Sequence, residues 1–290
     1  MISLFHPDSF YHFRRNPFAR SSVPIILTGI ICLILAGMIR GEIFLMNRFI
    51  PEDILLKIRH QDVLIGVTIY LKTSVDFAIF IGNLMAQFRG VKNRIMIEIG
   101  TALGNALGTM MILGIWNLFK EIDWLLSLMI LWAALVLFQL AEDGLEHFLE
   151  NQSGFPKNIR KIVEVYALVL DKVNSVTGLI LKKVMPNLSM SAPKNLSLTQ
   201  LIFFSFSIPF ILGLDDFAGY VPLFSEVNVF GFALGVIVGH MVLNIFLFIS
   251  PTKTIKLVKN PLIALLGSFA FVLLGIWGLW EVGKMYLIGH

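Results

Sequence analysis

The chain alternates long apolar segments with shorter polar ones. Seven segments of roughly 17 to 27 residues carry almost no charge, and about 20 residues of α-helix cross a hydrocarbon core of about 30 Å. They lie near residues 23–39, 63–86, 95–118, 124–141, 198–224, 227–250 and 261–280. This pattern predicts an all-α, polytopic membrane protein with seven transmembrane helices.

Composition supports that prediction and narrows the chemistry. Apolar residues make up 57% of the 290 residues and charged residues only 14%, against about 25% in a typical soluble domain. The single cysteine, Cys32, rules out an intramolecular disulfide, a thiolate zinc site and an iron–sulfur cluster. The net charge of +4 is not gathered in one basic patch, which argues against nucleic-acid binding.

Basic residues are distributed by membrane side. With a cytoplasmic N-terminus, sixteen lysines and arginines fall on inner segments and six on outer ones, while Lys72 lies inside a span. The positive-inside rule therefore predicts a multi-pass protein of the inner or plasma membrane, with the N-terminus inside and the C-terminus outside. The first apolar run is long for a signal-peptide core and lacks a small-x-small cleavage site. We therefore expect a retained extra helix over 23–47, after a cytoplasmic segment 1–22.

The long inner segment, residues 149–197, has a pattern of its own. From Lys157 to Val184, apolar residues recur at steps of three and four with basic residues among them, which predicts an amphipathic helix. Such a helix fits a connector that lies in the anionic cytoplasmic interface, or a regulatory or partner-docking element. Pro186 and Pro193 indicate a joint before the fifth span.

The second half of the chain repeats features of the first. Asp76-Phe77-Ala78 lies in the second span and Asp216-Phe217-Ala218 in the fifth, and each is followed by a helix with glycine at every fourth position. The glycines are Gly100, Gly104 and Gly108 in the third span and Gly231, Gly235 and Gly239 in the sixth. Because each unit has three helices, the pattern predicts two inverted repeats, over 63–148 and 198–290. Close helix packing alone would also explain the glycines.

Ionisable groups within the spans need a reason, because each costs about 2.5 to 3.5 kcal/mol at the bilayer centre. Asp76 lies about midway along its span, and Asp215 and Asp216 lie about two-thirds of the way through theirs. Two polar helical stripes are expected, one made of Thr68, Lys72, Asp76 and Asn83 and one made of Glu98, Thr101, Asn105 and Thr109. Pro209 and Gly213 precede the Asp215–Asp216 pair, which suggests an ion site built on a broken helix.

Several of these residues have simpler explanations. Lys72 and Asp76 are four residues apart and can neutralise each other. Glu98 can pair with Arg94 near the cytoplasmic end of its span. His240, with Asn244 one turn later, is typical of an interhelical hydrogen bond as well as of a metal ligand.

The chemistry that fits best is cation binding by oxygen ligands. Carboxylates and amide oxygens suit divalent ions such as Mn²⁺, Ca²⁺ or Mg²⁺, and one histidine does not exclude softer ions. The candidate metal ligands are Asp76, Asp216, Asp215, Asn83, Asn105, Glu98 and His240. A carboxylate buried in the membrane holds a proton when empty and releases it when a cation binds, so proton-coupled exchange is expected.

The paired segments Val75–Ala78 and Leu214–Ala218, each before a glycine-rich helix, resemble the lysine-exporter superfamily of membrane transporters, nearest to its manganese-efflux, cadmium-resistance and TerC-like branches. The resemblance covers about residues 63–280. It implies that Asp76 and Asp216 are paired metal-binding aspartates near the membrane middle, and that the activity is efflux of a divalent cation. The extra N-terminal span and the lack of a Glu-x-Gly-Asp-Lys signature depart from the Golgi manganese branch.

The expected function is thus a secondary transporter for a divalent cation and protons, without a resident cofactor and with oligomeric state left open. An exporter of amino acids or another small organic solute on the same scaffold is the main alternative. An intramembrane enzyme is not expected, because the chain has no Gly-x-Ser-x-Gly elbow and no His-Glu-x-x-His helix. A purely structural scaffold leaves the buried Asp215 and Asp216 unexplained.

Overall fold

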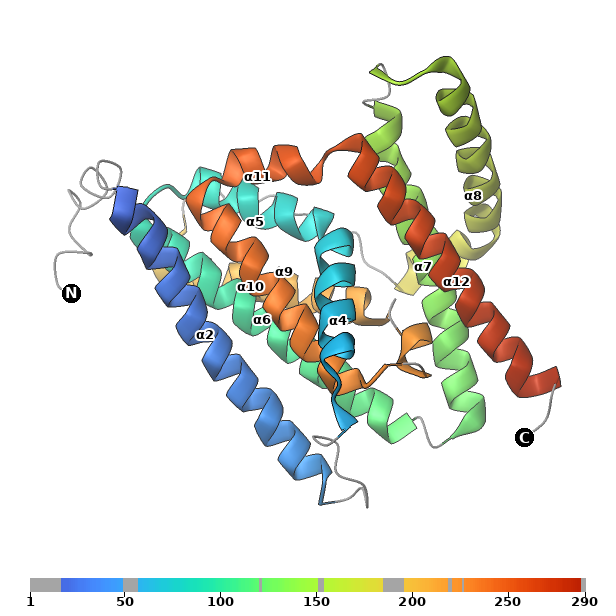
Figure 1. Ribbon diagram of the computed structural model, residues 1–290, viewed down its shortest axis with the longest axis horizontal. Helices are drawn as coiled ribbons and strands as arrows, with labels where there is room; N and C mark the ends of the chain where they lie inside the picture. Colours follow the sequence, from blue (N-terminus) through green and yellow to red (C-terminus); the bar gives the residue numbers. More distant parts are fainter. Residues whose placement is uncertain are drawn as a thin grey trace. The chain divides into compact units, whose positions relative to one another are not determined.

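The computed structural model describes residues 17–48, 57–119, 122–150, 154–184, 196–218, 221–225 and 227–287. These residues are helical apart from short turns, and no strand occurs among them. The helices, drawn in Figure 1, are α2 (Pro17–Met46), α4 (His60–Thr73), α5 (Val75–Gln87), α6 (Val91–Phe119), α7 (Asp123–Glu150), α8 (Lys157–Val184), α9 (Leu198–Ala218), η3 (Val221–Ser225), α10 (Val229–Ile249), α11 (Pro251–Val258) and α12 (Pro261–Leu287). Most of the predicted segment 1–22 lies outside the described residues.

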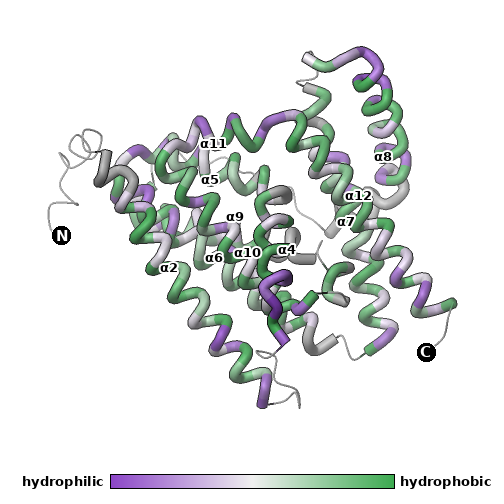
Figure 2. The backbone as a smooth tube through the Cα atoms, in the orientation of Figure 1, coloured by the Kyte–Doolittle hydropathy of each residue, from purple (hydrophilic) through white to green (hydrophobic). Residues whose placement is uncertain are grey.

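Five helices are long and apolar enough to cross a membrane, judged by length and composition. Their apolar stretches are Ser22–Met46, Val91–Trp116, Asp123–Leu145, Val229–Ile249 and Pro261–Leu287, in α2, α6, α7, α10 and α12. Figure 2 shows these helices as hydrophobic over most of their length, whereas α8 alternates between hydrophilic and hydrophobic residues. The described helices therefore confirm the all-α class and are consistent with a polytopic membrane protein, and five of the seven predicted spans are single long helices.

The second predicted span is not one helix. It divides at Ser74 into α4 and α5, and α5 turns away from the direction of α4 (Figure 1). Ser74 stands between the β-branched residues Thr73 and Val75, and all three have weak helix propensity. The predicted continuous stripe of Thr68, Lys72, Asp76 and Asn83 is therefore wrong, because the first two residues belong to α4 and the last two to α5.

The fifth predicted span differs in the opposite way. α9 continues through Pro209 and Gly213 to Ala218, so the break that we expected before Asp215 is absent from this helix. Proline is tolerated inside membrane helices where neighbouring helices compensate for the lost backbone hydrogen bond. Here α6 packs closely against α9 on the turn before the proline.

Chain contacts divide the molecule into two compact units. One unit holds most of α2, α4, α5, α6, α9, α10 and α11, and the other holds α7, α8, η3, α12 and the ends of neighbouring helices. In the first unit, α4 packs on α10 through glycines. A Cβ atom added at Gly235 would overlap the Val63 carbonyl oxygen and lie 2.9 Å from the Gly66 Cα atom. Two backbones touch here, so neither Gly66 nor Gly235 has room for a side chain.

The first unit contains a second pair of the same kind, α6 on α9. A Cβ atom at Gly104 would overlap the Phe206 carbonyl oxygen and lie 3.1 Å from the Phe210 amide nitrogen. One at Gly100 would lie 2.7 Å from the Ile202 carbonyl oxygen. Of the glycine rows noticed in the sequence, Gly100 and Gly104 of the third predicted span therefore pack closely against α9, and Gly235 and Gly239 of the sixth pack closely against α4.

The second unit is built on α7 and α12, which pack against each other along much of their length. Gly275 of α12 faces the Phe138 ring, and the Ser268 hydroxyl donates to the Ala141 carbonyl at 2.6 Å. The predicted amphipathic helix is confirmed as α8, with the predicted ends. Its buried residues Val163 and Leu170 pack into a core with α7 and α12.

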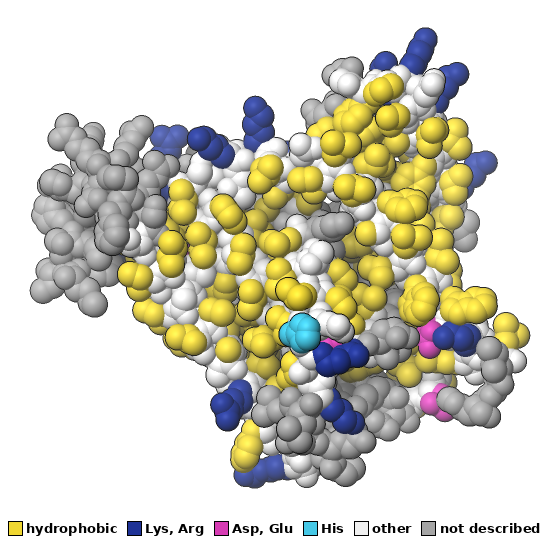
Figure 3. All heavy atoms as spheres, in the orientation of Figure 1, with side chains coloured by type: hydrophobic (Ala, Val, Ile, Leu, Met, Phe, Trp, Pro, Cys, Tyr) yellow, Lys and Arg dark blue, Asp and Glu magenta, His cyan; other side chains and the backbone are white. Residues whose placement is uncertain are grey.

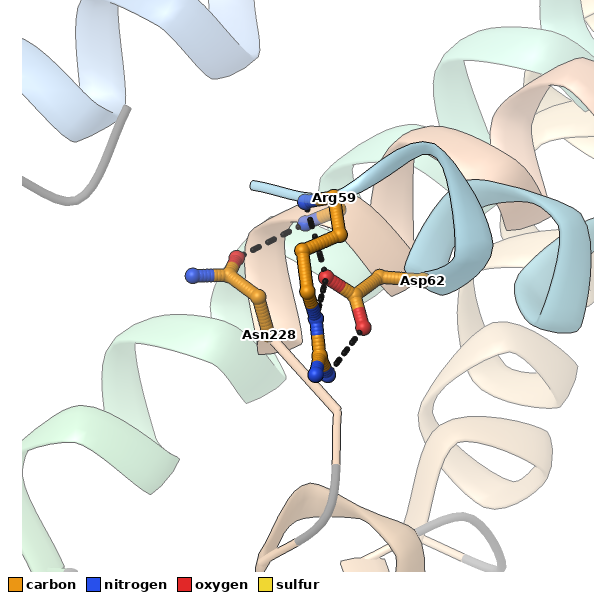
Figure 4. Close-up of polar contacts among 4 residues, drawn as sticks. Arg59, Asp62 and Asn228 are labelled. Carbon is orange, nitrogen blue, oxygen red and sulfur yellow. Dashed lines mark hydrogen bonds and ion pairs between the residues drawn. The ribbon is translucent and has the colours of Figure 1, made fainter. Parts of the chain in front are cut away.

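The start of α4, outside the second predicted span, is held by an ion pair (Figure 4). Arg59 Nη2 donates to Asp62 Oδ1 at 2.8 Å, and the Arg59 backbone N–H donates to Asp62 Oδ2 at 2.9 Å. Burial alone would raise the pKa of the fully buried Asp62 carboxyl. The hydrogen bonds from Arg59 and from the Asn228 backbone outweigh burial and hold that pKa below its usual value.

Asp62 is therefore expected to make stability depend on acid pH. A lowered pKa adds stability above the unfolded value of about 3.9 and loses it as the pH falls through the folded value. We expect Asp62→Asn to unfold at a lower temperature than the native chain at pH 7, and the gap to close progressively below about pH 4. Thermal unfolding of detergent-purified protein between pH 7 and pH 3 measures this, and a gap independent of pH would refute it.

Candidate intramembrane site

The three aspartates that the sequence singles out are placed by their backbones. Asp76 is the second residue of α5, immediately after the break at Ser74, and Asp215 and Asp216 lie in the last turn of α9. Their side chains lie outside the described part of the chain. The position of Asp76 is the more informative, because a broken membrane helix presents backbone groups that an unbroken one keeps paired.

A buried polar cluster lies next to this break. The Tyr70 hydroxyl, in the last turn of α4, is 2.7 Å from His240 Nδ1 of α10, and the Asn244 amide nitrogen is 3.1 Å from His240 Nε2. All three side chains are 1% exposed or less. Both ring nitrogens of His240 are therefore engaged, and the interhelical hydrogen bond that the sequence offered for this residue is confirmed.

Phe77 ties the cluster to the candidate aspartate. Its ring centroid is 5.0 Å from that of His240 and 6.4 Å from that of Tyr70, in edge-to-face arrangements. Since Phe77 follows Asp76 directly, the backbone of Asp76 is adjacent to the Tyr70–His240–Asn244 cluster. Helices α4, α5 and α10 thus converge where α4 gives way to α5.

Glu98 does not take part in the Tyr70–His240–Asn244 hydrogen bonds but makes one with α2. The Thr28 hydroxyl of α2 donates to Glu98 Oε1, and Glu98 is fully buried. The Arg94 guanidinium, one turn earlier on α6, donates to the Phe248 backbone carbonyl of α10. The extra N-terminal helix therefore supplies the hydrogen bond to the buried carboxyl of Glu98.

The polar stripe predicted on the third span is present and buried. Thr101, Asn105 and Thr109 of α6 are each 2% exposed or less. Buried polar atoms of this unit that have no hydrogen-bond partner among the described residues include Glu98 Oε2, Asn105 Nδ2, Thr109 Oγ1 and Asn244 Oδ1. Buried polar groups are rarely left unpaired in proteins, so these atoms mark places where a water molecule, a proton or a cargo can bind.

The structure brings together some of the predicted residues and separates others. It joins His240 to Asn244 and packs His240 against Phe77, the residue after Asp76, whereas Asn83 is exposed on α5 and Glu98 contacts α2. Within the described ranges, no group of three or more His, Cys, Asp and Glu side chains is arranged to hold a metal ion. The sequence analysis missed Tyr70 and Thr28. Tyr70 had one detectable signal, since a tyrosine hydroxyl in a membrane helix needs a partner.

Removing the Tyr70 hydroxyl is expected to lower the stability of the folded protein. Tyr70→Phe leaves His240 Nδ1 buried without its partner, which costs about 1 to 3 kcal/mol of stability. The thermal unfolding midpoint in detergent should fall accordingly. Tyr286→Phe, at an exposed tyrosine of α12, is the matched control and should leave the midpoint unchanged. Equal midpoints for the two variants would contradict a structural role for the Tyr70–His240 contact.

No protein-family model, curated protein or solved structure matches the chain. The resemblance to the lysine-exporter superfamily therefore stays a prediction that depends on the residues quoted for it.

Proposed function

We propose that the protein is a secondary transporter that exports a divalent cation such as Mn²⁺ in exchange for protons. The observation that carries this proposal is the break at Ser74, which lies within a predicted span, two residues before Asp76 and beside the buried Tyr70–His240–Asn244 cluster. Discontinuous helices with ionisable residues at the break are how many secondary transporters build their cargo sites.

The pairing of the helices supports the inverted repeat on which the proposal depends. The first helix of repeat 1 (α4) packs on the glycine helix of repeat 2 (α10), and the first helix of repeat 2 (α9) packs on the glycine helix of repeat 1 (α6). The last helices of the two repeats, α7 and α12, pack on each other. Two repeats related by a pseudo-two-fold axis require this reciprocal pairing, in which the first helix of each repeat packs on the glycine helix of the other.

The available ligands favour a hard or borderline divalent cation. We assign the Asp76 carboxylate as the ligand from the first repeat. The Asn244 amide oxygen, which has no partner among the described residues, is one turn from His240. We assign Asp216 the corresponding role in the second repeat, because it occupies the same place in the Asp-Phe-Ala motif.

Proton exchange follows from the cost of a bare charge in the membrane. An intramembrane carboxylate is stable when it holds a proton or a cation, so binding of the cation releases the proton. Each binding step at Asp76 or Asp216 therefore exchanges one for the other.

A substrate panel tests the proposal. Protein reconstituted in proteoliposomes should take up Mn²⁺, and Ca²⁺ or Mg²⁺ less well or equally, while radiolabelled lysine and other amino acids should not accumulate above empty liposomes. Amino-acid uptake without divalent-cation uptake would refute the proposal and support the organic-solute exporter. Uptake of neither class would refute both transport functions.

A further inference from the structure

Helix α8 has two apolar faces, and only one of them is covered by protein. The covered face packs on α7 and α12 through Val163, Leu170 and Asn174, which are 7% exposed or less. The other face, which we call the exposed stripe, consists of Ile159, Ile162, Val165, Leu168, Val169 and Val173. Ile162 and Val165 are 69% and 62% exposed, so no described part of the chain covers them.

The contacts of α8 show where along α7 it lies. Asn174 donates through its amide to the Phe138 carbonyl at 2.9 Å and to Glu142 Oε2 at 2.6 Å. Phe138 lies within the apolar stretch Asp123–Leu145 of α7, while α8 begins at Lys157, a short connection after the end of α7. The helix therefore runs back along α7 from beyond the span to the level of the span itself.

Exposed basic residues border the exposed stripe. Lys161 lies one turn before Val165, and Lys172 lies one turn after Val169, and both are exposed. The sequence of α8 holds six basic and two acidic residues in all. Figure 3 shows hydrophobic side chains gathered over the region of α8, at the upper right, with lysine and arginine side chains beside them. Apolar surface with a basic border is the pattern of a helix bound at an anionic lipid surface.

We propose that α8 is a lipid-binding element. The exposed stripe enters the boundary between headgroups and acyl chains of the cytoplasmic leaflet, and Lys161 and Lys172 bind anionic headgroups. The excess of basic over acidic residues on α8 favours an anionic lipid surface over a second copy of this chain, whose α8 carries the same charge. This proposal does not depend on the transported substrate.

The test uses the full chain with a fluorescent label. In a Cys32→Ser background, Val165→Cys is labelled with bimane, and the protein is placed in nanodiscs of phosphatidylcholine with brominated acyl chains, with or without phosphatidylglycerol. We expect strong quenching with the anionic lipid. Lys161→Gln with Lys172→Gln should lower the ratio of lipid-bound to unbound exposed stripe about 30-fold. Each basic residue near an anionic surface contributes about fivefold to that ratio. Lys161→Arg with Lys172→Arg should restore it.

Two controls make the result specific. The same label at Glu164→Cys, on the exposed side that Glu164 shares with Asp171, should stay unquenched, and Lys253→Gln with Lys256→Gln on α11 should leave quenching at position 165 unchanged. Quenching at position 165 that ignores both the anionic lipid and the α8 lysines would overturn the proposal. So would absence of quenching together with cross-linking of position 165 between two copies, because the exposed stripe would then be an interface between protomers.

Discussion

Asp216→Asn and Asp76→Asn are each expected to abolish divalent-cation transport while leaving the protein folded. Asparagine keeps the size of the side chain and removes the charge that binds the cation and the site that carries the proton. Replacing groups that merely support metal ligands already lowers metal affinity or activity about 10- to 100-fold. Losing a carboxylate ligand should therefore reduce initial Mn²⁺ uptake by at least that much. Uptake into proteoliposomes at matched protein density measures the effect.

The matched control is Asp171→Asn, the same substitution at an exposed position of α8. It should transport Mn²⁺ at the native rate. If Asp76→Asn and Asp216→Asn both transported as well as Asp171→Asn, neither aspartate would be a cation ligand. Loss of activity in only one of them would restrict the site to one repeat and contradict the paired roles.

Gly235→Ala is expected to cause a large loss of stability for the addition of a single methyl group. The new Cβ atom would overlap the Val63 carbonyl oxygen and lie 2.9 Å from the Gly66 Cα atom, so two backbones would have to move apart. Overpacking of this kind costs about 1 to 3 kcal/mol, and we expect the upper end because backbone atoms cannot rotate away. The thermal midpoint of the detergent-purified protein should fall markedly.

Gly104→Ala and Gly37→Ala complete this comparison. Gly104 makes the corresponding contact in the α6–α9 pair, so Gly104→Ala should lower stability about as much as Gly235→Ala. A Cβ atom at Gly37 of α2 would meet nothing within 4 Å. Gly37→Ala should be neutral or stabilise by up to about 1 kcal/mol, since alanine favours helix. A midpoint for Gly235→Ala equal to that of Gly37→Ala would show that α4 and α10 do not pack through glycine.

The helices were largely predictable because hydropathy and periodicity decide them. α8 begins and ends at the predicted Lys157 and Val184, since its apolar positions recur at helical spacing and polar residues fill the rest. The glycine rows were also predictable, because small residues every fourth position allow close packing. Ser74 was missed because one serine in an apolar run is a weak signal, and the turn of α5 depends on packing against α10. Pro209 suggested a break that the structure does not have, since tertiary packing keeps α9 continuous.

The candidate site was predicted only in part, because spacing along one helix does not identify a partner on another. His240 was correctly expected to make an interhelical hydrogen bond, yet its partner Tyr70 is 170 residues away in the sequence and could only be found in three dimensions. Asn83 was grouped with Asp76 by helical spacing, but its side chain is exposed. Thr28 lies on a helix outside both predicted repeats, so the repeat pattern gave no reason to connect it with Glu98.

The most direct test of the central claim is simultaneous recording of Mn²⁺ uptake and lumenal pH in proteoliposomes. We predict that Mn²⁺ entry makes the lumen more alkaline, that an imposed pH gradient with an acidic lumen accelerates entry, and that Asp216→Asn loses both effects. Mn²⁺ entry that moves no protons, ignores the pH gradient and persists in Asp216→Asn would contradict proton-coupled export through intramembrane aspartates.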